Sequence, residues 1–165
     1  MSSQRVNSFP SPNFKNIDFF GGAAHSVDDD GWLTVTSVNN EGSSAVHVNL
    51  APSTQYAWSV EVKAPDSTVH TVSYVYTANW KLLSAINTAN GRGECHFTTP
   101  DDEGKINISF QGGLTNGSPL KFMNPLLELA STYDAAVAGG ARRTPSCSLG
   151  TLAQNNRRSA WVVAA

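Results

Sequence analysis

The segment that most constrains the fold is residues 55–64, QYAWSVEVKA, in which large apolar side chains alternate with small or charged ones. A period of two sends successive side chains to opposite faces of a β-strand. Aromatic and β-branched residues on one face suit a half-buried sheet. Pro52 and Pro65 interrupt regular structure on either side. Residues 55–64 therefore predict a central strand of an antiparallel sandwich whose other strands come from the rest of the chain.

Similar short apolar patterns recur along the sequence, separated by turns. They predict strands over residues 32–38, 45–50, 69–77, 94–99, 105–110 and 120–129, the last bent at Pro125. The stretch 78–90 predicts either a loop with a short helix or a further strand. Thirteen glycines and eight prolines supply frequent turns. The spacing predicts an all-β protein, an antiparallel β-sandwich of jelly-roll type with about eight or nine strands.

Alternation also predicts pairing and side-chain direction within these strands. Residues 32–38 and 45–50, joined by an Asn/Gly-rich turn, are expected to form a hairpin. In 105–110, Ile106, Ile108 and Phe110 are expected on the core face. In 69–77, strict alternation places Val72, Tyr74 and Tyr76 together on one face.

Charge divides the chain into two parts. The net charge of −2 argues against general nucleic-acid binding, which requires a clustered basic surface. All 13 acidic residues lie in residues 1–134, whereas residues 135–165 contain four arginines and no acid. We therefore expect residues 1–135 to form the jelly-roll sandwich and residues 136–165 to form an extended or flexible C-terminal arm.

The arm is too short to bury much surface alone, so it should be disordered or docked on a partner. Arginines pair well with carboxylates on another protein, and a tryptophan flanked by valines would anchor in a groove or add an edge strand. A loose, cleavable tail is the alternative. The arm residues expected to bind a partner are Arg142, Arg143, Arg157, Arg158, Trp161, Val162 and Val163.

Targeting signals and catalytic motifs are not apparent in the sequence. The N-terminus lacks the apolar segment of a signal peptide, and no run approaches the ~18 apolar residues of a membrane span. We expect a chain made in the cytoplasm with no membrane partner. The four histidines form no HExxH motif, and no CxxC or Gly-x-Ser-x-Gly occurs. The sequence therefore predicts no catalytic residues and no enzyme activity.

Two groups of residues could bind a ligand. The carboxylates of Asp28, Asp29 and Asp30 are hard oxygen ligands that suit a structural calcium ion, or they form a charged turn before a strand. Otherwise no cofactor is predicted. A sugar would pack its apolar face on an exposed ring. Trp80, with Tyr74 and Tyr76 beside it, is the candidate for glycan contact, and core packing is the alternative.

Four segments of the sequence resemble a known family. LAPSTQYAWSVEVKAP (50–65), HFTTPDDEGKINISF (96–110), NPLLELASTYDA (124–135) and the opening SPNFK (11–15) together resemble carbohydrate-binding-module-like, galactose-binding-type jelly rolls. The resemblance spans roughly residues 8–135 and implies a fold rather than a function. Such domains occur in secreted glycosidases and in tail, fibre and head accessory proteins of bacteriophages.

Two functions follow as expectations. The main one is a non-catalytic virion protein of a bacteriophage, a head-decoration or minor tail subunit assembled in the host cytoplasm. Such a subunit would bind neighbouring capsid or tail subunits through its arm and sandwich edges, and would form a homo-oligomer. The missing secretion signal and the uncharged surface favour this role. The alternative is a carbohydrate-binding module that mediates attachment to host or extracellular glycans.

Overall fold

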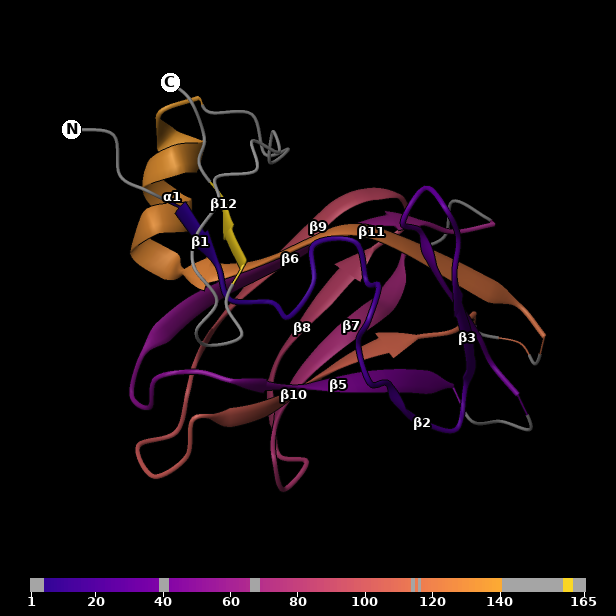
Figure 1. The fold of residues 1–165 in the computed structure, drawn as a ribbon, viewed down its shortest axis with the longest axis horizontal. Helices are drawn as coiled ribbons and strands as arrows, with labels where there is room; N and C mark the ends of the chain where they lie inside the picture. The colour runs from indigo at the N-terminus through magenta and orange to yellow at the C-terminus, as the bar shows by residue number, and fades with distance from the viewer. Residues whose placement is uncertain are drawn as a thin grey trace.

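The computed structural model describes residues 5–38, 42–65, 69–113, 115, 117–140 and 159–161. Two five-stranded antiparallel sheets stack face to face, as the ribbon in Figure 1 shows. We call them by their middle strands. The β10 sheet has the order β2-β5-β10-β7-β8, and the β11 sheet has the order β3-β4-β11-β6-β9. The prediction of an all-β antiparallel sandwich is confirmed.

The elements are short and connected by tight turns. The β10 sheet consists of β2 (Phe20–Gly21), β5 (Ser43–Asn49), β7 (His70–Thr77), β8 (Leu82–Thr88) and β10 (Lys105–Gln111). The β11 sheet consists of β3 (Ala24–Val27), β4 (Leu33–Thr36), β6 (Gln55–Lys63), β9 (Gly91–Thr98) and β11 (Pro119–Leu129). Outside the sandwich lie β1 (Arg5–Asn7), α1 (Ala130–Ala138) and β12 (Ser159–Trp161).

The core lies between the two sheets and is built as the alternation predicts. On β6, Trp58 is fully buried, stacks on Phe9 with ring centroids 5.2 Å apart, and donates its Nε1–H to Ser73 Oγ at 3.0 Å. From β10, the side chains of Ile106, Ile108 and Phe110 are also fully buried, as predicted. β6 is an interior strand, paired with β11 on one side and β9 on the other.

The predicted hairpin of residues 32–38 and 45–50 is wrong. β4 pairs with β3 and β11, whereas β5 pairs with β2 and β10, so the chain passes from one sheet to the other between them. Alternation shows that a segment is a strand with one buried face, but it does not specify the partner strand. Crossing between sheets places two apolar faces on opposite sides of a single core.

The predicted common face of Val72, Tyr74 and Tyr76 is also wrong. A register shift between Thr71 and Ser73 interrupts the pairing of β7 with β8. An extra residue in one strand of a pair reverses the direction of the side chains that follow it. Val72 is consequently buried in the core, whereas Tyr74 and Tyr76 lie on the outer face of the β10 sheet.

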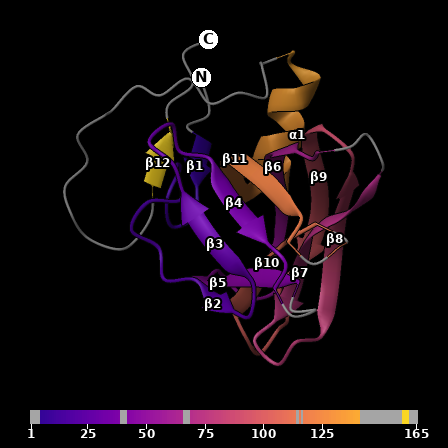
Figure 2. The ribbon, with the colours of Figure 1, turned by 90° about the vertical axis from the view of Figure 1, so that its right-hand side faces the viewer.

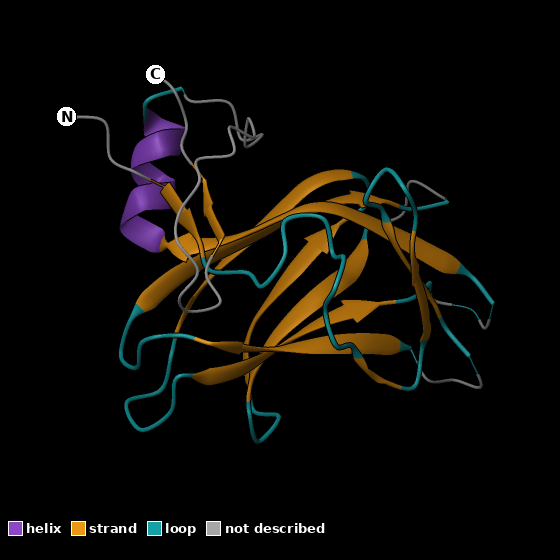
Figure 3. Cartoon of the chain, viewed as in Figure 1, coloured by secondary structure: helices purple, strands orange, loops and turns teal. Residues whose placement is uncertain are grey.

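For residues 78–90, where a strand and a loop with a helix were both open, the structure shows a strand. β8 pairs with β7 through a turn over residues 78–81. α1 is the one helix in the part of the chain that the structure describes (Figure 3). No helix among these residues is long and apolar enough to cross a lipid bilayer.

Helix α1 covers the outer face of the β11 sheet near β6 and β11, as the turned view in Figure 2 shows. Tyr133 and Val137 of the helix pack on Ala57 and Leu126. The face of β6 that points away from the core carries small residues such as Ala57, which leave room for the helix. The helix covers this face, so it is buried as well. The helix also continues past residue 135, where the sequence placed the end of the sandwich.

Gly93 of β9 lies where β8 and β9 approach each other closely at the edge of the sandwich. A Cβ at this position would lie 2.2 Å from Ile86 Cγ2 and 3.2 Å from Thr88 Cγ2. Gly93→Ala is expected to lower the free energy of unfolding by about 1–3 kcal/mol, measured by urea denaturation. In an Ile86→Ala background the same change should cost much less. A Gly93→Ala variant as stable as the wild type would contradict this close approach.

Candidate functional site

The outer face of the β10 sheet carries a continuous line of aromatic rings. Tyr74 lies 5.5 Å from Tyr76, and Tyr76 lies 5.4 Å from Trp80, measured between ring centroids. Phe20 lies 5.8 Å from Trp80 and stacks on the imidazole of His47 at 4.2 Å. These five residues, which we call the aromatic row, come from four separate segments: β2, β5, β7 and the turn after β7.

Strand register explains why these side chains meet. Asn107 of β10 is paired with His47 of β5 on one side and with Tyr76 of β7 on the other. Directly opposed residues in antiparallel strands point to the same face of a sheet. The sequence predicted Tyr74, Tyr76 and Trp80 together, and the structure places them in contact. The sequence analysis did not single out Phe20 and His47 for this site, because these two residues come near the others only through the pairing of β2, β5 and β10.

Trp80 sits in a turn that presents its ring to solvent. The Trp80 N–H donates to Thr77 O at 3.0 Å, and Thr77 N–H donates to Lys81 O at 2.9 Å. Residues 78–80 form the three-residue loop between Thr77 and Lys81. In this loop Trp80 adopts the left-handed backbone conformation, with φ of 64°. That conformation costs a residue with a Cβ roughly 1–2 kcal/mol, so glycine is usual there. Trp80 nevertheless occupies the position with 53% of its surface exposed, as expected where a strained residue serves a function.

Asn107 connects this turn to His47. Its side chain is 1% exposed and lies between the two. The Nδ2 group donates to Thr77 O at 3.3 Å and to Ala78 O at 3.5 Å, while Oδ1 lies 2.6 Å from His47 Nδ1. A single buried amide thereby fixes both the turn that carries Trp80 and the orientation of the imidazole.

The face is nearly free of charge. None of the five strands of the β10 sheet contains Asp or Glu, and Lys105 is their one lysine. Partial burial raises the pKa of Tyr76 above its ordinary value, and the neighbouring Tyr74 adds to the shift. The Tyr76 phenol is therefore neutral near pH 7 and can both donate and accept a hydrogen bond. Rings combined with neutral polar groups suit an uncharged ligand that carries hydroxyls.

Asp28, Asp29 and Asp30, which the sequence suggested as calcium ligands, lie in the turn before β4. The Asp28 carboxylate accepts a hydrogen bond from Trp32 N–H at 2.8 Å, and Lys15 Nζ donates to Asp29 O at 3.1 Å. The part of the chain that the structure describes contains no group of three or more His, Cys, Asp or Glu side chains that could hold a metal ion. These contacts fit the alternative, a charged turn before a strand, because Asp28 closes the turn onto Trp32. Calcium binding by this segment stays a prediction.

Most of the arm residues predicted to bind a partner lie outside the described residues. These are Arg142, Arg143, Arg157, Arg158, Val162 and Val163. Trp161 is the exception, because it belongs to β12, which pairs with β1 of the same chain so that Trp161 lies opposite Arg5. An added strand was one form the arm was expected to take, but here it is added within the chain. Binding of the arm to another protein stays a prediction.

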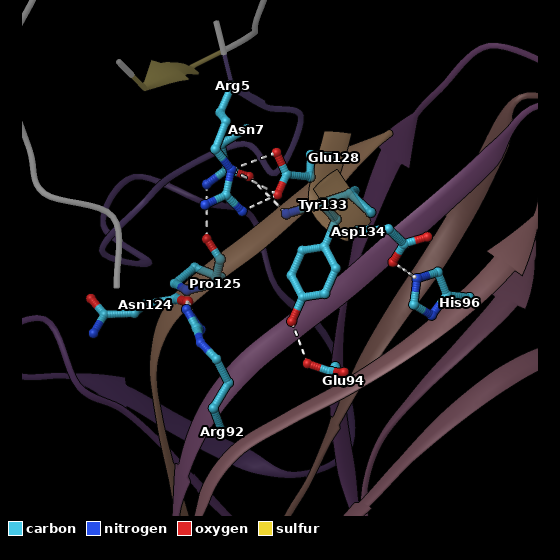
Figure 4. A network of polar contacts seen from close by, with 11 residues as sticks. Arg5, Asn7, Arg92, Glu94, His96, Asn124, Pro125, Glu128, Tyr133 and Asp134 are labelled. Carbon is cyan, nitrogen blue, oxygen red and sulfur yellow. Dashed lines mark hydrogen bonds and ion pairs between the residues drawn. The ribbon is translucent and has the colours of Figure 1, made fainter. Parts of the chain in front are cut away.

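A second polar cluster lies on the opposite side of the molecule, under α1 (Figure 4). Arg5 of β1 forms a buried ion pair with Glu128 of β11, and its Nε lies 3.0 Å from Glu128 Oε2. On the helix, Tyr133 donates its hydroxyl to Glu94, and the Asp134 carboxylate lies 2.9 Å from His96 Nε2. These contacts hold β1 and α1 on the β11 sheet, so the cluster is structural.

Comparison with known proteins identifies the fold. Neither a family model nor a curated protein matches the sequence. Among solved structures, a CBM4 module matches with a TM-score of 0.50 and 18% identity over 71% of this chain and 81% of that chain. The CBM1 module of BiXyn10A in its apo form matches with a TM-score of 0.51 and 14% identity over 72% and 94%. The chain has the jelly-roll fold of carbohydrate-binding modules, as the sequence resemblance predicted.

The expected link to bacteriophages stays a prediction. A tailspike protein of bacteriophage CBA120 matches with a TM-score of 0.49 and 12% identity, over 21% of its own chain. Likeness at this level is no argument for a virion role. At these identities the comparisons show the fold alone, and neither the virion role nor glycan binding follows from them.

Proposed function

We propose that this protein is a carbohydrate-binding module that holds a glycan against the aromatic row. The observation that carries the proposal is the exposed indole of Trp80, held in a left-handed turn in the middle of a line of contacting rings. A ring in this position can pack against the apolar face of a sugar. The strain is understandable if the ring is needed there, because a glycine would fit the backbone better.

The line of rings also suits a chain of sugars better than a single one. Neighbouring ring centroids in the row are 4.2–5.8 Å apart, from Tyr74 through Tyr76 and Trp80 to Phe20 and His47. Several rings in sequence can contact successive residues of an oligosaccharide. Phenol hydroxyls and the His47 ring lie beside them to exchange hydrogen bonds with sugar hydroxyls.

The scarcity of charged side chains on the strands of the β10 sheet limits the class of glycan that this face can bind. An acidic polysaccharide would call for several cations on the face, but the five strands supply one lysine. We therefore expect a neutral glycan.

A location in a virion, a homo-oligomer, and capsid or tail partners stay predictions from the sequence, to be tested by mass spectrometry of purified particles.

The proposal is tested with the full chain and a panel of soluble glycans. Binding to a β-1,4-glucan, a xylan, a mannan and an acidic pectin would be measured by affinity electrophoresis and calorimetry. The wild type is expected to bind at least one neutral glycan saturably and to leave the pectin unbound. Tyr74→Ala combined with Tyr76→Ala should weaken that binding at least tenfold, because two rings of the row are removed.

The matched control lies on the other sheet. Asp134→Ala removes an exposed carboxylate on α1, on the opposite side of the sandwich, and should leave glycan affinity unchanged. No binding to any glycan by the wild type would refute the proposed function. Binding that survives the double tyrosine change would place the ligand elsewhere on the molecule.

A further inference from the structure

We propose that His47 determines specificity on this face, accepting a hydrogen bond from a ligand hydroxyl at Nε2 while Nδ1 carries the proton. The inference deepens the proposed function and depends on it, because the ligand is taken to be the glycan on the aromatic row. The contacts around His47 determine which of its two ring nitrogens is the acceptor. Asn107 is the positioning residue.

The orientation of the Asn107 amide follows from its partners. Thr77 O and Ala78 O are backbone carbonyls and can only accept hydrogen bonds, so the group that faces them must be the donor, Nδ2. The Asn107 side chain is almost fully buried between β5 and β7, so it cannot turn its amide toward solvent instead. Oδ1 must therefore face His47.

The tautomer of His47 follows from that orientation. Oδ1 is an acceptor, and it lies 2.6 Å from His47 Nδ1, which must therefore carry a proton to form the bond. In a neutral imidazole only one nitrogen is protonated. The other nitrogen, Nε2, is then left with a lone pair and acts as an acceptor. The arrangement makes His47 complementary to a hydroxyl donor.

The ring is also held in place. Phe20 stacks on the imidazole with centroids 4.2 Å apart and an angle of 23° between the planes. His47 is an exposed residue of β5, and none of the hydrogen bonds among the described residues involves its Nε2. Phe20 in turn contacts Trp80, with ring centroids 5.8 Å apart, so a single ring separates His47 from the indole on which a sugar would pack. An acceptor fixed beside a stacking surface selects a sugar with a hydroxyl at one particular position.

The tautomer is tested on the free protein, before any ligand is added. Long-range ¹H–¹⁵N spectra distinguish a protonated imidazole nitrogen from a bare one, at a pH where the ring is neutral. The expected result is a proton on Nδ1 and a bare Nε2 at His47. A bare Nδ1 would overturn the inference without touching the proposed function.

The acceptor role is tested by substitution. His47→Phe keeps a ring to stack on Phe20 but has no nitrogen, and it should weaken binding of the best glycan of the panel about tenfold. His47→Gln, which offers an amide oxygen, should bind more tightly than His47→Phe. Circular dichroism would confirm that each variant is folded.

His25→Phe is the matched control. His25 is also exposed and contacts a phenylalanine, Phe19, at 4.7 Å, but its Nδ1 lies 3.3 Å from Ser44 Oγ on the core-facing side of β5. The His25→Phe variant should bind the best glycan of the panel with the same affinity as the wild type. If the wild type binds and His47→Phe binds equally well, only the inference is overturned. If the wild type binds no glycan, both the inference and the proposed function are overturned.

Discussion

Trp80→Ala is expected to weaken glycan binding roughly 10- to 100-fold while the sandwich stays folded. The estimate comes from the transfer free energy of a large apolar side chain, about 1.5–3 kcal/mol, which the ligand would no longer gain from covering the indole. The fold should survive because the ring is half exposed and lies outside the core. Calorimetry with the best glycan of the panel measures the first effect, and thermal unfolding measures the second.

Trp80→Gly is the control that separates ligand contact from backbone strain. Both variants lack the indole, so both should lose the same affinity. The backbone at this position has φ of 64°, which glycine adopts freely and alanine does not. The glycine variant should therefore be more stable than the alanine variant by about 1 kcal/mol. Equal stabilities would mean that the turn relaxes, and retained binding would remove Trp80 from the site.

Glu128→Gln is expected to lower the free energy of unfolding by about 3–5 kcal/mol. Side-chain exposure is 7% for Arg5 and 1% for Glu128, so the change leaves a buried guanidinium without its counter-charge. Urea denaturation followed by tryptophan fluorescence measures the loss. Glycan affinity of the folded protein should not change, because the pair lies under α1 on the other sheet.

The control replaces both members of the pair. Arg5→Met combined with Glu128→Met removes the unpaired charge and should be more stable than Glu128→Gln. A Glu128→Gln variant within about 0.5 kcal/mol of the wild type would show that the strand β1 detaches easily and that the ion pair contributes little to stability.

The sequence predicted those parts of the fold that depend on local alternation. β6 and β10 follow a strict period of two, so their limits could be predicted to within one residue, and so could buried residues such as Trp58 and Ile108. The bend at Pro125 also appears, as a register shift between Met123 and Leu126. These features need information from neighbouring residues only.

Features that depend on distant residues could not be read in the same way. Arg5 and Glu128 are 123 residues apart, and no local pattern indicates that they meet. The bulge in β7 reverses the faces of Tyr74 and Tyr76, yet the sequence VHTVSYVYT shows no sign of it. The helix was missed because only Tyr133 and Ala130 of its nine residues are buried, which gives a weak apolar stripe.

The candidate site was predicted in part for the same reason. Trp80, Tyr74 and Tyr76 are close in sequence, and their aromatic character was enough to single them out. Phe20 and His47 enter through strand pairing across β2, β5 and β10. Asn107 is nearly invisible in the sequence, because an asparagine in a strand becomes informative only when its partners on both sides are known.

The position of α1 gives the molecule a front and a back. The helix and β1 lie over the β11 sheet, at the upper left of Figure 1, while the aromatic row lies on the outer face of the other sheet. A fusion domain or a surface tether joined before β1 or after α1 would therefore start from the side turned away from the aromatic row. With a glycan bound as proposed, a protein attached in this way would lie flat on the polymer while the attached domain stays clear of it.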